Sequence, residues 1–122
     1  MARFLVHRHT TGKTHFDLRL VQGDTARSWS LMKEPPERAD ERRLAIEREE
    51  LPVAAISGPR IEEEAFGVGR VRAWDSGEAA VTVDTQDRLV LVFSGKRLQG
   101  QYELRRMKWY PGNRWLLQKS GA

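Results

Sequence analysis

The side chains of this chain that could do chemistry gather near its N-terminus. All three histidines fall within nine residues, at His7, His9 and His15, and Asp17 and Arg19 follow at intervals of two. Imidazoles with a carboxylate form a mixed nitrogen and oxygen donor set that suits Mn²⁺, Zn²⁺, Fe²⁺ or Ni²⁺. A guanidinium beside such an ion can form a two-pronged contact with a phosphate or carboxylate. The pattern predicts a metal or phosphate site, with a solvated polar strand face as the alternative.

Two predicted strands would position these side chains. Residues 4–9 and 15–20 both alternate between apolar and polar types, and the short segment between them contains a glycine. Side chains two residues apart share one face of a strand. An antiparallel hairpin would therefore place His9 opposite His15 and the first histidine opposite Asp17. The other face of the hairpin would be apolar.

The composition is typical of one folded domain covering residues 1–122. Hydrophobic residues make up 39% of the chain and charged residues 31%, with no cysteine and a net charge of +4. The absence of cysteine excludes disulfides and thiolate metal sites, and the modest positive charge permits nucleic-acid binding. No apolar run approaches the roughly 20 residues of a membrane span, and the N-terminal residues do not resemble a signal peptide. We expect a cytoplasmic monomer with no membrane segment.

The remaining pattern is mostly β. Further strands are expected at residues 27–32, 67–74, 79–83, 89–93, 101–107 and 114–119. Asp75–Gly77 is typical of a turn, and residues 37–50 fit either a helix or a strand. Residues 52–66 form a long excursion, in which Glu62–Glu64 should be a solvated loop that nothing pairs with the histidines. Many short strands in one domain predict a small antiparallel β-barrel with one or two short helices or helical turns.

The four tryptophans divide into two groups. Trp29, Trp74 and Trp115 lie within alternating strands and should belong to the core. Trp109 precedes a turn and follows basic residues, so it is a candidate for base stacking. Our candidates for contact with nucleic acid are Arg42, Arg106, Lys108 and Trp109.

The segment from His9 to Leu20 resembles the signature of the 3′-phosphoesterase domain of bacterial DNA ligase D and its stand-alone relatives. That family carries Lys-His, a short basic loop and then His-Tyr-Asp-Leu-Arg-Leu. This chain has Arg8-His9, a five-residue loop and His15-Phe16-Asp17-Leu18-Arg19-Leu20. Further similarities follow in the same order at Ser28-Trp29-Ser30, Arg43-Leu44-Ala45-Ile46, Phe66-Gly67-Val68-Gly69, Trp74-Asp75-Ser76-Gly77 and Trp115-Leu116-Leu117-Gln118-Lys119.

The resemblance implies a site and an activity. His9, His15 and Asp17 would hold Mn²⁺. Arg19 would bind the scissile phosphate, and Arg43 matches a second arginine that contacts phosphate. The family trims 3′ ends of DNA or DNA–RNA primers by removing a terminal ribonucleoside and then a 3′-phosphate. The implied partners are such 3′ ends and a separately encoded ligase or polymerase.

This chain departs from the family on the phosphate side of the site. Leu51 replaces a family histidine and Ala55 a family tyrosine, whereas His7 stands where many relatives have glutamine and could add a ligand or an acid/base group. The family's Ile-Pro-Glu-Gly-Glu segment is also replaced, by residues 61–65. Two functions follow. One is a metal-dependent phosphoesterase with weakened activity, and the other is a catalytically impaired module that binds DNA ends or a repair protein.

Overall fold

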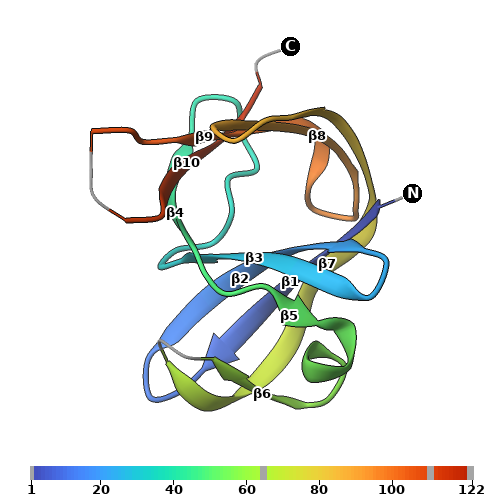
Figure 1. Cartoon of the computed structure of the whole chain (residues 1–122), viewed down its shortest axis with the longest axis vertical. Coiled ribbons are helices and arrows are strands. Elements are labelled where there is room, and N and C mark those ends of the chain that lie inside the picture. The colour runs from blue at the N-terminus through green and yellow to red at the C-terminus, as the bar shows by residue number, and fades with distance from the viewer. Residues whose placement is uncertain (1, 64–65, 110–111, 121–122) are drawn as a thin grey trace.

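The computed structural model describes residues 2–63, 66–109 and 112–120, and it arranges them in short antiparallel strands (Figure 1). The strands are β1 (Ala2–Thr10), β2 (Thr14–Gln22), β3 (Thr25–Leu31), β4 (Arg42–Glu47), β5 (Leu51–Pro52), β6 (Arg60–Glu63), β7 (Gly67–Asp84), β8 (Arg88–Ser94), β9 (Gln99–Arg106) and β10 (Arg114–Lys119). One turn of 3₁₀ helix, η1 (Val53–Ile56), lies between β5 and β6. No helix within these described ranges has the length and apolar character needed to cross a bilayer.

Eight of the strands close into a barrel. Their order is β1-β2-β3-β4-β10-β9-β8-β7, and β7 pairs with β1 to complete the circle. Apolar side chains fill the inside, including the fully buried Phe4, Leu18, Trp29 and Trp115. Trp74 is partly buried and packs against the same core. The predictions of a small antiparallel β-barrel with a helical turn and of a tryptophan-rich core are confirmed.

The ambiguous stretch from residue 37 to residue 50 contains a strand. β4 pairs with β10 along its length and with the end of β3, and Ala45 is fully buried in the barrel. Leu44 is 45% exposed, so its spacing from later apolar residues does not mark a buried helical face. Pairing with two neighbouring strands decides the local structure, because strand preference depends strongly on tertiary context.

The predicted turn at Asp75–Gly77 is wrong, because β7 runs through it without a break. The Asp75 side chain is buried and accepts hydrogen bonds from the backbone N–H groups of Lys96, Arg97 and Leu98 at 2.8–3.0 Å. Gly77 lies so close to the β8 backbone at Ser94 that a side chain there would collide with it. Asp75 and Gly77 therefore allow β7 to pack closely against the end of β8 and the β8–β9 turn.

A cap, which we define as residues 51–63, covers the outer face of the barrel at β1–β3 (Figure 1). A second apolar cluster holds it in place, made of Val21, Ala26, Ile56 and Ile61. Because of this cap, both faces of β2 are buried. The prediction of a solvated loop at Glu62–Glu64 is wrong for Glu63, which is 2% exposed, and Glu64 lies outside the described residues.

Candidate metal centre

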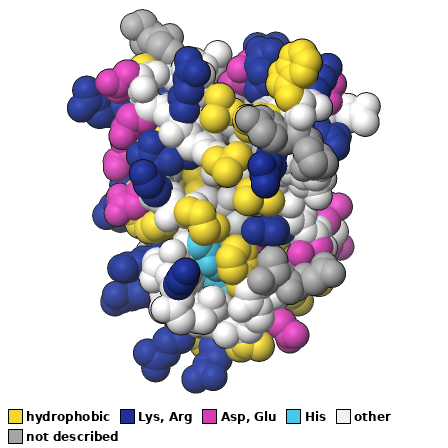
Figure 2. Space-filling model, turned by 90° about the vertical axis from the view of Figure 1, so that its left-hand side faces the viewer, with side chains coloured by type: hydrophobic (Ala, Val, Ile, Leu, Met, Phe, Trp, Pro, Cys, Tyr) yellow, Lys and Arg dark blue, Asp and Glu magenta, His cyan; other side chains and the backbone are white. Residues whose placement is uncertain are grey.

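The β1–β2 hairpin brings the predicted metal ligands together. His9 pairs with His15, and His7 pairs with Asp17, in the predicted register. Their side chains leave the outer face of the barrel, where the cap buries them; His9 and Asp17 are 0% exposed. Figure 2 shows only a small patch of histidine surface, between hydrophobic and basic side chains.

Four donor atoms converge at this place, and they lie within 4.8 Å of one another. His9 Nδ1 is 2.9 Å from Glu63 Oε1 and 3.3 Å from His15 Nε2. Asp17 Oδ2 is 3.1 Å from His15 Nε2 and 3.7 Å from His9 Nδ1. His15 Nε2 and Glu63 Oε1 are 3.7 Å apart. The cluster thus contains two imidazoles and two carboxylates.

These residues fit a divalent transition metal. A tetrahedral ion with ligands at about 2.0–2.1 Å requires donor atoms about 3.3–3.4 Å apart, which lies in the middle of the observed range. His9 Nε2 donates a hydrogen bond to the Ile61 carbonyl at 3.1 Å, so Nδ1 is the ring nitrogen that faces the cluster, an arrangement usual for a metal-binding histidine. Glu63 Oε2 is buried and has no hydrogen-bond partner among the described residues. A cation in the cluster would compensate this buried carboxylate.

Arg19 forms the base of the cluster. Its Nη2 donates to Asp17 Oδ2 at 3.2 Å and to Glu63 Oε1 at 3.0 Å. Its Nη1 donates to Ser28 Oγ at 2.8 Å, and its Nε donates to His7 Nδ1 at 3.2 Å. The sequence predicted that Arg19 contacts phosphate. In the structure the residue is 0% exposed, and its guanidinium is shared between two carboxylates, so any phosphate must compete with Glu63 for it.

The ionisable groups of the cluster shift one another's pKa values. Burial opposes the charged form of His15, but hydrogen bonds to Asp17 and Glu63 outweigh burial and raise the pKa of His15 to about 9. Burial, helped by Glu63, raises the pKa of Asp17. Burial would also raise the pKa of Glu63, but hydrogen bonds to His15 and Asp17 and the charge of Arg19 lower it. A cation entering the cluster must therefore displace a proton from His15.

His7 lies beside the cluster rather than in it. Burial, together with the positive charges of Arg19 and His9, lowers the pKa of His7 to about 4, so the ring is neutral at pH 7. Its Nδ1 accepts the hydrogen bond from Arg19 and orients that guanidinium. His7 is 8% exposed, more than His9, His15 or Asp17, so it could still reach a bound substrate.

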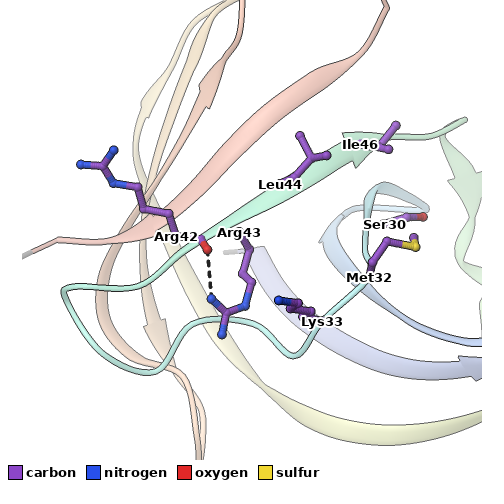
Figure 3. Close-up of a pocket in the computed structure, with 7 residues that line it drawn as sticks. All are labelled: Ser30, Met32, Lys33, Arg42, Arg43, Leu44 and Ile46. Carbon is purple, nitrogen blue, oxygen red and sulfur yellow. Dashed lines mark hydrogen bonds between the residues drawn. The ribbon is translucent and has the colours of Figure 1, made fainter.

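Arg43 is not part of the cluster, and it lines a neighbouring cavity of about 260 Å³ with Ser30, Met32, Lys33, Arg42, Leu44 and Ile46 (Figure 3). Its guanidinium donates to the carbonyls of Glu34 and Arg42 at 2.7 and 2.9 Å. Ser30 connects the cavity to the metal centre, because its hydroxyl donates to Asp17 Oδ1 at 2.8 Å. Arg43 thus lies on the far side of Ser30 from the histidines.

Sequence reasoning missed Glu63 and Arg48. Arg48 Nε donates to Ser30 Oγ at 3.2 Å, and its guanidinium lies 4.9 Å from the centre of the Phe66 ring. Phe66 stacks on the His15 ring at 3.8 Å and covers it. One signal could have identified Glu63: residues 60–63 alternate in the manner of a strand, which places Glu63 on the same face as the apolar Ile61. Nothing in the sequence around Arg48 shows that it reaches this site.

The remaining predicted residues lie apart from the cluster. Leu51 packs in the apolar cluster beneath the cap, and Ala55 is exposed on η1. Trp109 is 92% exposed, and Lys108 forms an ion pair with Asp87 at 3.0 Å. The β9–β10 connection that carries Arg106, Lys108 and Trp109 lies at the opposite end of the molecule from the β1–β2 loop (Figure 1). Their contact with nucleic acid, and that of the exposed Arg42, stays a prediction.

Comparison with known proteins gives matches to one family. The model of the DNA Ligase D 3′-phosphoesterase domain family matches residues 7–106. The chain is 31% identical over 123 residues to the multifunctional non-homologous end joining DNA repair protein LigD of Mycobacterium tuberculosis, which covers 93% of this chain. The LigD proteins of Mycolicibacterium smegmatis and Pseudomonas aeruginosa are 27% and 29% identical and cover 93% and 85% of the chain. The chain spans only 13–16% of the length of these relatives.

Proposed function

The chain belongs to the DNA ligase D 3′-phosphoesterase domain family, and from this premise we propose that it is a metal-dependent phosphoesterase of nucleic-acid 3′ ends. Its substrates would be DNA or DNA–RNA primer ends in non-homologous end joining. A separate ligase or polymerase would be its partner protein. The observation that carries the proposal is the convergence of two imidazoles and two carboxylates above Arg19. His9, His15 and Asp17, with Glu63 as a fourth donor, would hold Mn²⁺ or another divalent transition metal.

Arg19 is the residue that would bind the reacting phosphate. When bound, the metal ion supplies charge neutralisation, polarisation of a phosphoryl oxygen and a bound water of lowered pKa. A phosphate oxygen resembles the Glu63 carboxylate in charge and hydrogen-bonding capacity, so the substrate can take the place of Glu63 on Arg19 Nη2. Arg19 would then stabilise the additional negative charge of the transition state.

The neighbouring cavity would hold the phosphodiester adjacent to the cleaved group. Lys33, Arg42 and Arg43 line it, and Ser30 connects it to Asp17. Arg48 adds a further positive charge at Ser30. These basic groups favour a substrate that continues beyond the reacting phosphate, as a nucleic-acid strand does.

Two replaced residues predict a preference for diesters over terminal phosphate monoesters. Leu51 and Ala55 stand where the family has a histidine and a tyrosine, and neither can donate a proton or hydrogen bond. Loss of one such donor typically costs roughly 10²–10³-fold in rate. His7 is the remaining group that could supply a proton. Its low pKa leaves the ring neutral at pH 7, so Nδ1 accepts the hydrogen bond from Arg19 and Nε2 carries the hydrogen that a phosphate oxygen could accept.

A second function, a DNA-end or repair-protein binding module with a structural metal, is favoured by the closed form of the cluster. Structural zinc sites have four protein ligands, whereas catalytic sites keep one position open. Glu63 fills the fourth position here, and the cap buries it to 2% exposure.

The deciding experiment uses a primer-template that ends in a single 3′-ribonucleotide or in a 3′-phosphate, with Mn²⁺. The matched pair of variants is Asp17→Asn in the cluster and Asp24→Asn at an exposed turn. We expect wild type and Asp24→Asn to release a 3′-OH end, most readily from the ribonucleotide substrate, and Asp17→Asn to lose this activity. Equal rates in all three proteins would reject the assigned site. A wild type that binds metal and DNA ends but releases no product would establish the second function.

A further inference from the structure

Four arginines line a groove on the side of β1 and β7 that faces away from the metal centre. Two adjoining hollows of about 760 and about 250 Å³ form it, and they share Thr10 and Arg70. We call it the arginine groove, after Arg8, Arg60, Arg70 and Arg72. Arg8 lies between two buried histidines on β1, so its side chain leaves the opposite face of the strand.

Strand pairing places these arginines at two levels. Arg72 pairs with Arg8, and Arg70 pairs with Arg60 on one side and Thr10 on the other. The two levels are two residues apart along β7, about 7 Å. A chain of anions could contact both levels at once.

No carboxylate of the described residues neutralises the charge of the groove. All four arginines are exposed, and none forms an ion pair with a carboxylate among residues 2–63, 66–109 and 112–120. Some arginines elsewhere on the surface are paired with carboxylates; Arg88, for example, lies 2.6 Å from Glu103. Figure 2 shows basic side chains gathered at the lower left and bottom, the end at which Figure 1 shows β6. Such a concentration of positive charge attracts a polyanion.

We propose that the arginine groove binds the phosphodiester backbone of a nucleic-acid strand. Its lining combines guanidinium groups with the hydroxyls of Thr10, Thr11 and Thr14, which are the side-chain types that contact phosphate without reading sequence. Among the described lining residues, Pro59, Val68 and Val71 are the only ones with apolar side chains, which is few for docking a folded protein.

The groove lies directly behind the metal centre. Gly69 forms part of its floor, and a Cβ at this position would lie 2.7 Å from His9 Nε2. If the metal centre processes 3′ ends, as proposed above, the groove would hold the strand a few nucleotides from that end. The inference about binding itself does not require catalysis.

The test measures binding to circular single-stranded DNA, which has no 3′ end, by fluorescence anisotropy at several salt concentrations. The variant is Arg70→Gln/Arg72→Gln. The matched control is Arg3→Gln/Lys96→Gln, which removes two exposed charges outside the groove. We expect the groove variant to bind at least tenfold more weakly than the control. Its slope of log affinity against log salt should fall by about 1.4, since each lost phosphate contact contributes about 0.7 for a single strand.

Each other outcome has a definite meaning. Equal binding by the groove variant and the control, or no binding by wild type, would overturn the proposal. If poly-glutamate competes as well as DNA of equal length, the groove is a site for an acidic protein and the nucleic-acid assignment is wrong. If the wild-type protein binds circular DNA through the groove but processes no 3′ ends, the proposed function is rejected and the groove proposal stands.

Discussion

The two faces of β2 are both buried, but different forces hold them. Phe16, Leu18 and Leu20 point into the barrel and belong to its apolar core. The alternate residues His15, Asp17 and Arg19 point outwards and are covered by the cap. Apolar packing on the inner face is non-directional and tolerates small rearrangements. The outer face is a network of charges whose members must remain paired, because an unpaired buried charge is costly.

The inner face of β2 thus contributes to the stability of the barrel, and the outer face carries the groups that could bind a metal. The barrel is closed by backbone pairing of β1 with β7. The polar network, in contrast, needs the cap to supply Glu63 and to exclude water. Substitutions on the inner face should therefore change the free energy of unfolding but not metal binding. Substitutions on the outer face should change metal binding, and those that leave a buried charge unpaired, above all at Arg19, should change the free energy of unfolding as well.

The largest expected effect is that of Arg19→Ala. It leaves the carboxylates of Asp17 and Glu63 buried without their cation, and breaking a buried charge pair in this way costs about 3–5 kcal/mol. Denaturant unfolding of the metal-free protein would measure the loss. The exposed pair of Arg38 and Asp40 gives the control, and Arg38→Ala should change stability little. An unchanged melting temperature for Arg19→Ala would restore the simpler view from the sequence, in which Arg19 serves only phosphate.

The next effect tests the inner face. Leu18→Ala should lower the free energy of unfolding by about 2–5 kcal/mol, because Leu18 is 1% exposed in the core. The affinity of the folded protein for Mn²⁺ should stay within a factor of about two. Leu44→Ala is the matched control, since Leu44 is 45% exposed and its loss should matter little. A parallel loss of metal affinity in Leu18→Ala would show that the two faces are coupled.

The sequence predicted the inner face and three of the four donors on the outer face. Period-two alternation around the β1–β2 loop was sufficient for the register of His9 with His15, because that pairing is local. Glu63 joins the cluster from more than forty residues further along the chain, through the β6–β7 pairing. Local alternation at residues 60–63 indicates only that Glu63 shares the face of Ile61, and it does not identify the histidines as partners. The continuity of β7 through Asp75–Gly77 was missed for the same reason. Asp75 binds the backbone of a distant turn instead of forming a turn of its own.

A smaller effect is expected for the outer face itself. His15→Ala removes one of four donors, and metal affinity should fall tenfold or more, on the order of 1.4 kcal/mol. His7→Ala is the control, because His7 lies beside the cluster and should leave metal affinity nearly unchanged. Calorimetric titration with Mn²⁺ and Zn²⁺ would measure both proteins. Equal affinity in wild type and His15→Ala would remove the metal assignment.

The smallest effect concerns protons, and it separates a true metal centre from a cluster held together by hydrogen bonds alone. The pKa of His15 is raised to about 9 in the metal-free protein, so the ring is protonated at pH 7 and must lose its proton to a metal. Binding should release at least one proton at pH 7, measurable by calorimetry in buffers of different ionisation enthalpy.

The sign of the pH dependence follows from the same shift. A raised folded-state pKa stabilises the metal-free protein below about pH 6.5, and this contribution is lost as the pH rises towards 9. Metal affinity should therefore increase over the interval in which metal-free stability decreases. His7 has the opposite sign. Its pKa is lowered to about 4, so it weakens the fold as the pH falls from about 6.5 to 4. Metal binding without proton release between pH 7 and 9 would mean that His15 is not displaced from Asp17. The ion would then lie outside the four-residue cluster.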